Sequence, residues 1–238
     1  GRKPEIFFQQ LDNQMLSSRN RLYFNRYKLQ INAAYQDNKL AHVGKADEYE
    51  VEMRLRTLTY DTKLYFPSDP YSEYVLGFQG MNQWNDNLND RETKLLPDAD
   101  LQNYSVFGLL QRTLFSKFKL QGGVRYDYRS ISTLALGDPA IADSFRPKLD
   151  KSYSNFSGSV GATFNVNESL LFRSNIAAAF RTPNLAELTS NGQHEERYEI
   201  GDASLHPQNA YEVDASLHVH KKSYTFDLAG FYNSIHDY

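Results

Sequence analysis

The sequence predicts an all-β protein, folded as an antiparallel up-and-down transmembrane β-barrel. Three observations lead to this prediction. Apolar and polar residues alternate with a period of two along most of the chain, the alternating segments are longer than ordinary strands, and short and long connections follow one another in strict order. A strand of such a barrel presents one face to lipid and the other to an enclosed interior, and the alternation supplies both faces.

Nine segments carry the alternation and are predicted to be strands. In the clearest, Lys117–Arg129, the even-numbered residues are apolar or glycine and the odd-numbered residues are mostly charged or polar. At roughly 10–15 residues, the segments suit tilted membrane strands, which need ~9–11 residues in hydrocarbon, better than the usual ~5–6-residue strand. In chain order the nine are Tyr23–Gln36, Glu48–Arg56, Glu73–Trp84, Leu101–Phe115, Lys117–Arg129, Ser154–Val166, Glu168–Phe180, Tyr211–His220 and Tyr224–Ile235.

The segments between the strands alternate in length. Short turns are predicted at Pro67–Pro70, Ser116, Asn165–Asn167 and Lys221–Lys222. Long loops are predicted at Asp37–Asp47, Asn85–Asp100, Ser130–Tyr153 and Arg181–Asn209. Transmembrane barrels place short periplasmic turns on one rim and long extracellular loops on the other. Before the first strand, Gln9–Leu16 does not alternate and is expected to form a short helix or a loop.

The apolar face of each strand is predicted to contact lipid. In Glu48–Arg56 this face carries Tyr49, Val51, Met53 and Leu55. Aromatic residues near strand ends on these faces suit the headgroup layer, where a ring with one polar end is favoured. The alternative is that tyrosine is simply a good strand residue. The candidates for such a girdle are Tyr126, Tyr128, Phe180, Tyr211, Tyr224 and Tyr232.

The composition narrows the possible partners. Aromatic residues make up 14% of the chain, yet the mean hydropathy is −0.63, which fits a membrane barrel or a soluble all-β protein with exposed tyrosines. There is no cysteine, which excludes disulfides, thiolate metal sites and a cysteine nucleophile. The net charge is −3 and no basic stripe stands out, so nucleic acid is not an expected partner.

Residues 1–238 are expected to be an internal part of one barrel domain from a longer polypeptide. No segment approaches the ~18 apolar residues of a membrane-spanning helix. The opening sequence GRKPEIFFQQ has no apolar region typical of a signal peptide, and the chain ends in strand-like sequence. Nine strands is an odd number, whereas single-chain bacterial barrels have even numbers.

The segment 180–211 resembles a late-barrel segment of TonB-dependent receptors. In that family a strand ends in a Phe-Arg-x-Pro-Asn box, followed by a glutamate and a Ser-Asn-Gly-x-His stretch. An aromatic-Glu-x-Gly-Asp/Asn turn and a Leu-x-Pro box then precede the next strand. Leu109–Tyr128 and the strand end at Tyr35–Asn38 also resemble parts of the family's barrel. The matching residues of the loop are Phe180, Arg181, Pro183, Asn184, Glu187, Ser190, Asn191, Gly192, His194, Tyr198, Glu199, Gly201, Asp202, Leu205 and Pro207.

The resemblance implies a transport receptor in the bacterial outer membrane rather than an enzyme. The family's barrel has 22 strands and encloses an N-terminal plug, and the expectation is that neither the plug nor the periplasmic box lies in residues 1–238. The implied partners are outer-membrane lipid, the TonB complex through the N-terminal part, and a small-molecule metal chelate such as a ferric siderophore or haem. No covalently bound cofactor is implied.

Four residues of the loop region are predicted to bind the ligand: His194, Glu195, Arg181 and Arg197. In haem receptors of the family, a histidine between two such boxes is an axial ligand, and imidazole suits iron and zinc. His194 is therefore the candidate metal ligand. The alternative is that the motif forms a structural corner in which His194 caps a turn. The segment 193–198 lacks the second histidine of a zinc-protease H-E-x-x-H site.

Polar residues on the opposite strand faces are predicted to line the lumen. Arg125, Arg129, Arg173 and Arg181 could guide an anionic chelate, but pairing with acidic residues of the lumen or plug is the favoured interpretation. His218 and His220 share one strand face, so they could chelate a metal. They lie beside the Lys221–Lys222 turn, and a solvated lumen face is the favoured interpretation there.

Three other functions are less favoured by the sequence. An outer-membrane enzyme barrel would need a nucleophile–base or paired-carboxylate site, and the sequence has no GxSxG motif and no convincing dyad. A passive porin would not need the specific loop motif. A soluble β-rich binding module would not need alternating short and long connections.

Overall fold

Ten long strands form a single antiparallel sheet in the computed structural model, which describes residues 8–43, 49–88, 94–140, 145–194 and 197–237. The sheet order is β1-β2-β3-β4-β5-β6-β7-β8-β11-β12, so each strand pairs with the next long strand along the chain. The strands are β1 Phe8–Phe24, β2 Tyr27–Val43, β3 Tyr49–Tyr65, β4 Ser72–Asn87, β5 Ala99–Leu114, β6 Phe118–Thr133, β7 Asp150–Asn167, β8 Leu170–Arg181, β11 Gln208–Lys221 and β12 Tyr224–His236.

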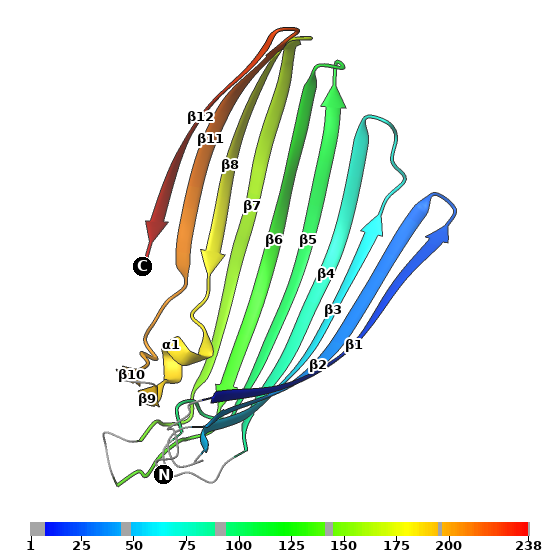
Figure 1. Cartoon of the computed structure of the whole chain (residues 1–238). Coiled ribbons are helices and arrows are strands. Elements are labelled where there is room, and N and C mark those ends of the chain that lie inside the picture. The colour runs from blue at the N-terminus through cyan, green and yellow to red at the C-terminus, as the bar shows by residue number, and fades with distance from the viewer. Residues whose placement is uncertain (1–7, 44–48, 89–93, 141–144, 195–196, 238) are drawn as a thin grey trace, which may run out of the picture.

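The predicted up-and-down topology is therefore confirmed. All short turns lie at one end of the sheet and all long connections at the other (Figure 1). The long connection between β8 and β11 contains helix α1 (Leu185–Thr189) and a separate hairpin of β9 (Asn191–His194) and β10 (Arg197–Ile200). The sequence predicts a loop over this whole segment, so neither α1 nor the hairpin was expected. In the described part of the chain, no helix is long and apolar enough to cross a membrane.

The predicted number of long strands was wrong by one, because Gln9–Leu16 belongs to β1 rather than to a helix or loop. This strand lacks a clean alternation: Leu11 and Met15 share one of its faces while Asp12 and Gln14 share the other. The chain reverses at Asn25, whose φ of 54° lies in the left-handed region that asparagine tolerates. The predicted segment Tyr23–Gln36 thus spans the end of β1 and most of β2.

The strand ends also lie outside the predicted bounds. The short turns fall at 168–169 and 222–223 and begin three residues and one residue later than predicted, because β7 continues to Asn167 and β11 to Lys221. At the long-loop end, β6 runs to Thr133 and β7 begins at Asp150, so the predicted loop Ser130–Tyr153 loses residues at both ends.

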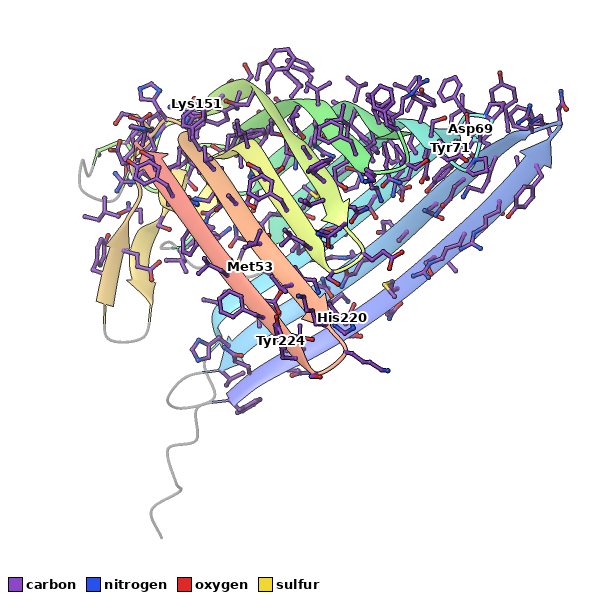
Figure 2. The ribbon with its side chains drawn as sticks, turned by 90° about the horizontal axis from the view of Figure 1, so that it is seen from above. Met53, Asp69, Tyr71, Lys151, His220 and Tyr224 are labelled. Atoms are coloured by element: carbon purple, nitrogen blue, oxygen red, sulfur yellow. The ribbon has the colours of Figure 1, made fainter. Side chains whose placement is uncertain are left out.

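Pairing register divides the side chains between two faces, because residues that pair across strands point to the same side. Val106, Tyr126 and Phe156 form one cross-strand row, and the adjacent row of Ser105, Asp127 and Asn155 points to the other side. Seen from above, the sheet curves around an open hollow lined by the polar rows (Figure 2). We call the face toward this hollow the inner face.

The outer face carries a broad exposed apolar surface. Its large exposed side chains come from nearly every strand: Leu22, Ile31, Leu76, Phe78, Val106, Leu110, Val124, Phe156, Val160, Phe164, Phe172, Ile176, Val213, Phe226 and Leu228. A soluble monomer rarely exposes a contiguous apolar patch above a few hundred Å². A sheet whose outer face is apolar over nearly all of its strands needs hydrocarbon against it.

Aromatic rings border this apolar surface at both ends. The Tyr60 hydroxyl bonds Asn82 at 3.3 Å and the Tyr126 hydroxyl bonds Ser154 at 3.1 Å, each partner lying nearer the long-loop end. At the short-turn end, Phe118 and Phe164 stack edge-on at 6.4 Å. All six aromatics predicted for a girdle lie on the outer face: Tyr126, Tyr128, Phe180, Tyr211, Tyr224 and Tyr232.

One predicted lipid face is wrong. Met53 and Leu55 pair in register with the inner-face residues Asn87 and Asn85, so they also lie on the inner face. Arg54 and Arg56 therefore lie on the outer face. There Arg54 pairs with Asp37 at 2.5 Å and Arg56 with Asp86 at 2.7 Å. This stretch lies beyond the aromatic border toward the long loops, where water rather than hydrocarbon faces the outer side and the apolar–polar rule reverses.

A charge in the middle of the apolar outer face should destabilise the barrel. Val160 lies centrally on β7 with 65% of its surface exposed. We expect Val160→Arg in the full-length protein to cost about 2–4 kcal/mol, the price of an arginine near the bilayer midplane. The measurement is equilibrium unfolding in lipid vesicles. The matched control is Ser159→Arg on the inner face, and an equal loss in both variants would contradict the face assignment.

Candidate ligand-binding site

The connection between β8 and β11 begins with helix α1, and the residues just before the helix fix where it starts. Asn184 is the N-cap of α1: its side-chain oxygen accepts from the Glu187 amide at 2.8 Å. The Glu187 carboxylate in turn accepts from the Asn184 amide at 2.9 Å. This reciprocal capping box satisfies two amides that have no partner in a helix's first turn. The Phe-Arg-x-Pro-Asn box followed by a glutamate is therefore a helix-start signal.

Helix α1 packs against the inner face of the sheet near its long-loop end (Figure 1). Leu185 and Leu188 are buried on Leu101, Ile131 and Tyr153, which come from β5, β6 and β7. Ile131 is fully buried although it lies at the rim of an open sheet. Burial of such side chains contributes about 1.5–3 kcal/mol each, so the connection is held inward, over the hollow.

Arg181 ties the helix to the two strands that flank it. Its guanidinium donates two hydrogen bonds to the Glu187 carboxylate, both at 2.9 Å, and a third to the Gln208 side chain at 2.9 Å. The Arg181 guanidinium beside Glu187 holds the pKa of that carboxyl below its usual value, and the Asn184 amide adds to this effect. Glu187 therefore stays ionised at neutral pH. Its carboxylate accepts hydrogen bonds from both Arg181 and the Asn184 amide.

The second half of the connection folds back onto α1. The Asp202 amide donates to the Glu187 carbonyl at 2.7 Å, and the Gly201 amide donates to the Ser190 carbonyl at 2.8 Å. A Cβ on Gly201 would lie 2.5 Å from the Thr189 amide nitrogen, so only glycine fits this contact. Two residues further along, the Ser204 hydroxyl donates to the Asp202 carboxylate and lowers the pKa of Asp202.

The β9–β10 hairpin is attached at its base. The Asn191 amide donates to the Leu95 carbonyl at 3.1 Å, and the Tyr198 hydroxyl donates to the Asn191 side chain at 2.9 Å. A Cβ on Gly192 would lie 3.3 Å from the Leu95 Cα. The motif residues Asn191, Gly192 and Gly201 thus have structural contacts, while Glu199 pairs through its backbone with Gly192.

The predicted ligand-binding residues fall into two groups. Arg181 lies within the network that fixes α1, with its side chain half exposed at 52%. His194 and Arg197 pair through their backbones in the β9–β10 hairpin. Their side chains, and the whole of Glu195, lie outside the described residues. Their role in binding stays a prediction.

A polar network on the inner wall confirms the favoured interpretation for Arg125. Its guanidinium donates to both carboxylate oxygens of Asp127, at 2.8 and 2.9 Å, to the Ser105 hydroxyl at 2.7 Å and to the Gln79 side chain. Ser105 and Gln79 come from β5 and β4. Neither residue could be predicted from the sequence, because only the register shows that they lie beside Arg125.

Arg129 differs from Arg125. It donates to the Thr182 hydroxyl at 3.0 Å, and it forms no ion pair with any described residue. Arg129 lies next to Tyr153 in register, directly below the surface on which α1 packs.

The two histidines on β11 share the inner face, as predicted. His218 contacts Asp227 through Nδ1, and His220 contacts the Thr225 hydroxyl at 2.9 Å. Their rings are parallel with centroids 6.4 Å apart, near the β11–β12 turn (Figure 2). Across the described ranges, no group of three or more histidine, aspartate or glutamate side chains could hold a metal ion.

Replacing Gly201 should release the folded-back segment. In Gly201→Ala the new methyl would overlap the Thr189–Ser190 backbone, so we expect faster hydrogen exchange at the amides of 201 and 202. Gly108→Ala is the matched control, because a Cβ there meets nothing within 4 Å. Unchanged protection of these amides in Gly201→Ala would show that the contact does not fix the loop.

A family model described as "TonB dependent receptor-like, beta-barrel" matches residues 4–238. A comparison with curated protein sequences finds no match. Several solved structures share the fold. The copper transporter OprC matches with a TM-score of 0.74 at 16% identity, over 96% of this chain and 39% of OprC.

Two further structures match over 98% of this chain. The haemophore receptor HasR of Serratia marcescens, solved with its haemophore HasA and haem, matches with a TM-score of 0.71 at 14% identity over 41% of its chain. The FrpB iron transporter of Neisseria meningitidis matches with a TM-score of 0.70 at 15% identity over 36% of its chain. This chain thus spans about two fifths of the length of these proteins.

The family model covers nearly the whole chain, and the open antiparallel sheet has the architecture of part of such a barrel. The alternation of faces, the inward-folded connection and the loop motif all agree with that match. The chain belongs to the TonB-dependent receptor family and forms part of its outer-membrane β-barrel.

Proposed function

We propose that this chain is part of the wall and mouth of an active transporter that imports a metal chelate, such as a ferric siderophore or haem. The observation that carries the proposal is the connection between β8 and β11. It packs on the inner wall through Leu185 and Leu188, and this attachment at the long-loop end supports a role of the connection in ligand binding. The match of residues 4–238 to the TonB-dependent receptor barrel favours a receptor over a passive pore.

The surrounding family supports this proposal. The similar structures are named as transporters or receptors of copper, iron, haem and siderophores, and none of those names describes an enzyme. In the proposed function the TonB complex supplies energy from the inner membrane. In this function, the plug of the full-length receptor lies against the inner-face network around Arg125 and Asp127.

Uptake in cells tests the proposal. Cells that carry the full-length receptor should accumulate ⁵⁵Fe from at least one of ferric citrate, a ferric hydroxamate or haem, and a deletion strain should not. Accumulation should stop when a protonophore collapses the proton gradient or when TonB is deleted, because both remove the energy source. Uptake that survives these treatments would identify a passive pore, and uptake of none of the three probes would contradict iron-chelate import.

We further propose that His194 ligates the metal of the bound chelate. It belongs to the β9–β10 hairpin, whose base is fixed at Asn191, and imidazole is a common ligand of iron and zinc. We expect His194→Ala to weaken binding of the transported chelate at least tenfold. His206→Ala is the matched control, because His206 is an exposed histidine of the same connection. Equal affinity of both variants would show that His194 only shapes the hairpin.

A further inference from the structure

Two histidines lie two residues apart on the inner face of β11, close to its short-turn end. His218 and His220 point to the same side of the strand, because side chains at i and i+2 share a face. Their rings are parallel with centroids 6.4 Å apart. The side chain of His218 is 42% exposed and His220 is exposed, so a solute in the hollow can reach both imidazoles.

A partner on β12 contacts the Nδ1 atom of each ring. Asp227 lies directly opposite His218 in register and contacts its Nδ1. Thr225 lies opposite His220, and its hydroxyl is 2.9 Å from the Nδ1 of that ring. An ionised carboxylate only accepts hydrogen bonds, so His218 donates from Nδ1, and its neutral ring keeps a lone pair on Nε2. A hydroxyl both donates and accepts, so Thr225 accommodates the same tautomer of His220.

These contacts resemble those of histidines that bind a metal ion. Such a histidine usually donates its second ring N–H to a carboxylate or another oxygen, which orients the ring and raises the basicity of the ligating nitrogen. Asp227 and Thr225 already provide those oxygens, and the two Nε2 atoms remain for an ion. A Zn²⁺ ion would lie about 2.0–2.1 Å from each Nε2, once the rings tilt toward each other. Exposed side chains make such rotations within nanoseconds.

The charges on the inner face near the two histidines favour a cation. Asp227 lies in the same cross-strand row as His218, whereas Arg173 pairs with Ser216 in the next row. The negative charge is therefore the nearer of the two. Among the described residues, no third histidine, aspartate or glutamate joins the pair as a ligand. Water therefore completes the coordination of an ion bound by the two rings.

We propose that His218 and His220 chelate a divalent transition-metal ion at the periplasmic rim of the barrel, with Asp227 as a positioning residue. The site takes Cu²⁺ most strongly, because Cu²⁺ heads the affinity order of the divalent first-row metals. Mg²⁺ and Ca²⁺ prefer oxygen ligands and do not bind there. The site lies at the opposite end of the sheet from α1 (Figure 1), so it is separate from the ligand site proposed for the β8–β11 connection.

Titration of the purified full-length receptor in detergent with Cu²⁺ tests the site. We expect the electron paramagnetic resonance spectrum of bound Cu²⁺ to include a species coupled to two imidazole nitrogens. His218→Asn and His220→Asn should each remove this species, and the double variant should lose no further Cu²⁺ affinity, because a chelate needs both rings. His206→Asn is the matched control, because His206 is an exposed histidine of the β8–β11 connection, and it should bind Cu²⁺ like the wild type.

A variant of Asp227 tests the positioning role. Asp227→Asn should weaken Cu²⁺ binding roughly 10- to 100-fold, the usual effect of removing the hydrogen-bond partner of a metal ligand. At saturating Cu²⁺ the two-nitrogen species should persist, because both ligating rings remain. Cu²⁺ affinity equal to that of the wild type would show that Asp227 serves only the β11–β12 pairing.

Two outcomes would overturn the metal site itself. One is a wild type whose bound Cu²⁺ shows no species with two imidazole nitrogens. The other is a two-nitrogen species that persists unchanged in both His218→Asn and His220→Asn, which would assign it to other histidines of the receptor. Cu²⁺ binding in detergent does not require transport, so a failure of chelate uptake would leave this site in place.

Discussion

The structure depends on the pairing of backbone hydrogen-bonding groups between neighbouring strands. Hydrocarbon offers no partner for an amide or a carbonyl, so each strand inside a membrane must be paired on both sides. Once the pairing register is set, every side chain has its face, because strand side chains alternate. The row Val106–Tyr126–Phe156 lies toward lipid for the same reason that Ser105–Asp127–Asn155 lies toward the hollow. The apolar band and the polar inner wall are two results of one register.

The polar inner wall then provides a platform for structure that the strands cannot form alone. Near the long-loop end, Leu101, Ile131 and Tyr153 replace polar residues on the inner face. This apolar surface has no lipid to meet, and helix α1 covers it. The Arg181–Glu187 pair and the capping box at Asn184 fix how the helix leaves the sheet. Residues that look like a ligand-binding motif therefore also form the attachment that holds the connection over the mouth.

The topology and most strand faces could be predicted from the sequence, because lipid imposes a strict period of two on the outer face. The prediction failed where lipid is absent. On β1 the polar end hides the alternation, and on β3 the outer side carries Arg54 and Arg56 because it faces water. The contacts of Arg125 with Gln79 and Ser105 join three strands. Such contacts follow from register, which the alternation of a single strand does not reveal.

The attachment of the β8–β11 connection divides it into a base and a tip. The base, from Arg181 to Ser190 together with Gly201 and Asp202, is bonded to the barrel or to itself. The β9–β10 hairpin leaves this base at Asn191 and returns to it at Ile200. Asn191 and Gly192 contact Leu95 where the hairpin begins, so a change at either residue would release the hairpin without disturbing the helix that holds the rest of the connection.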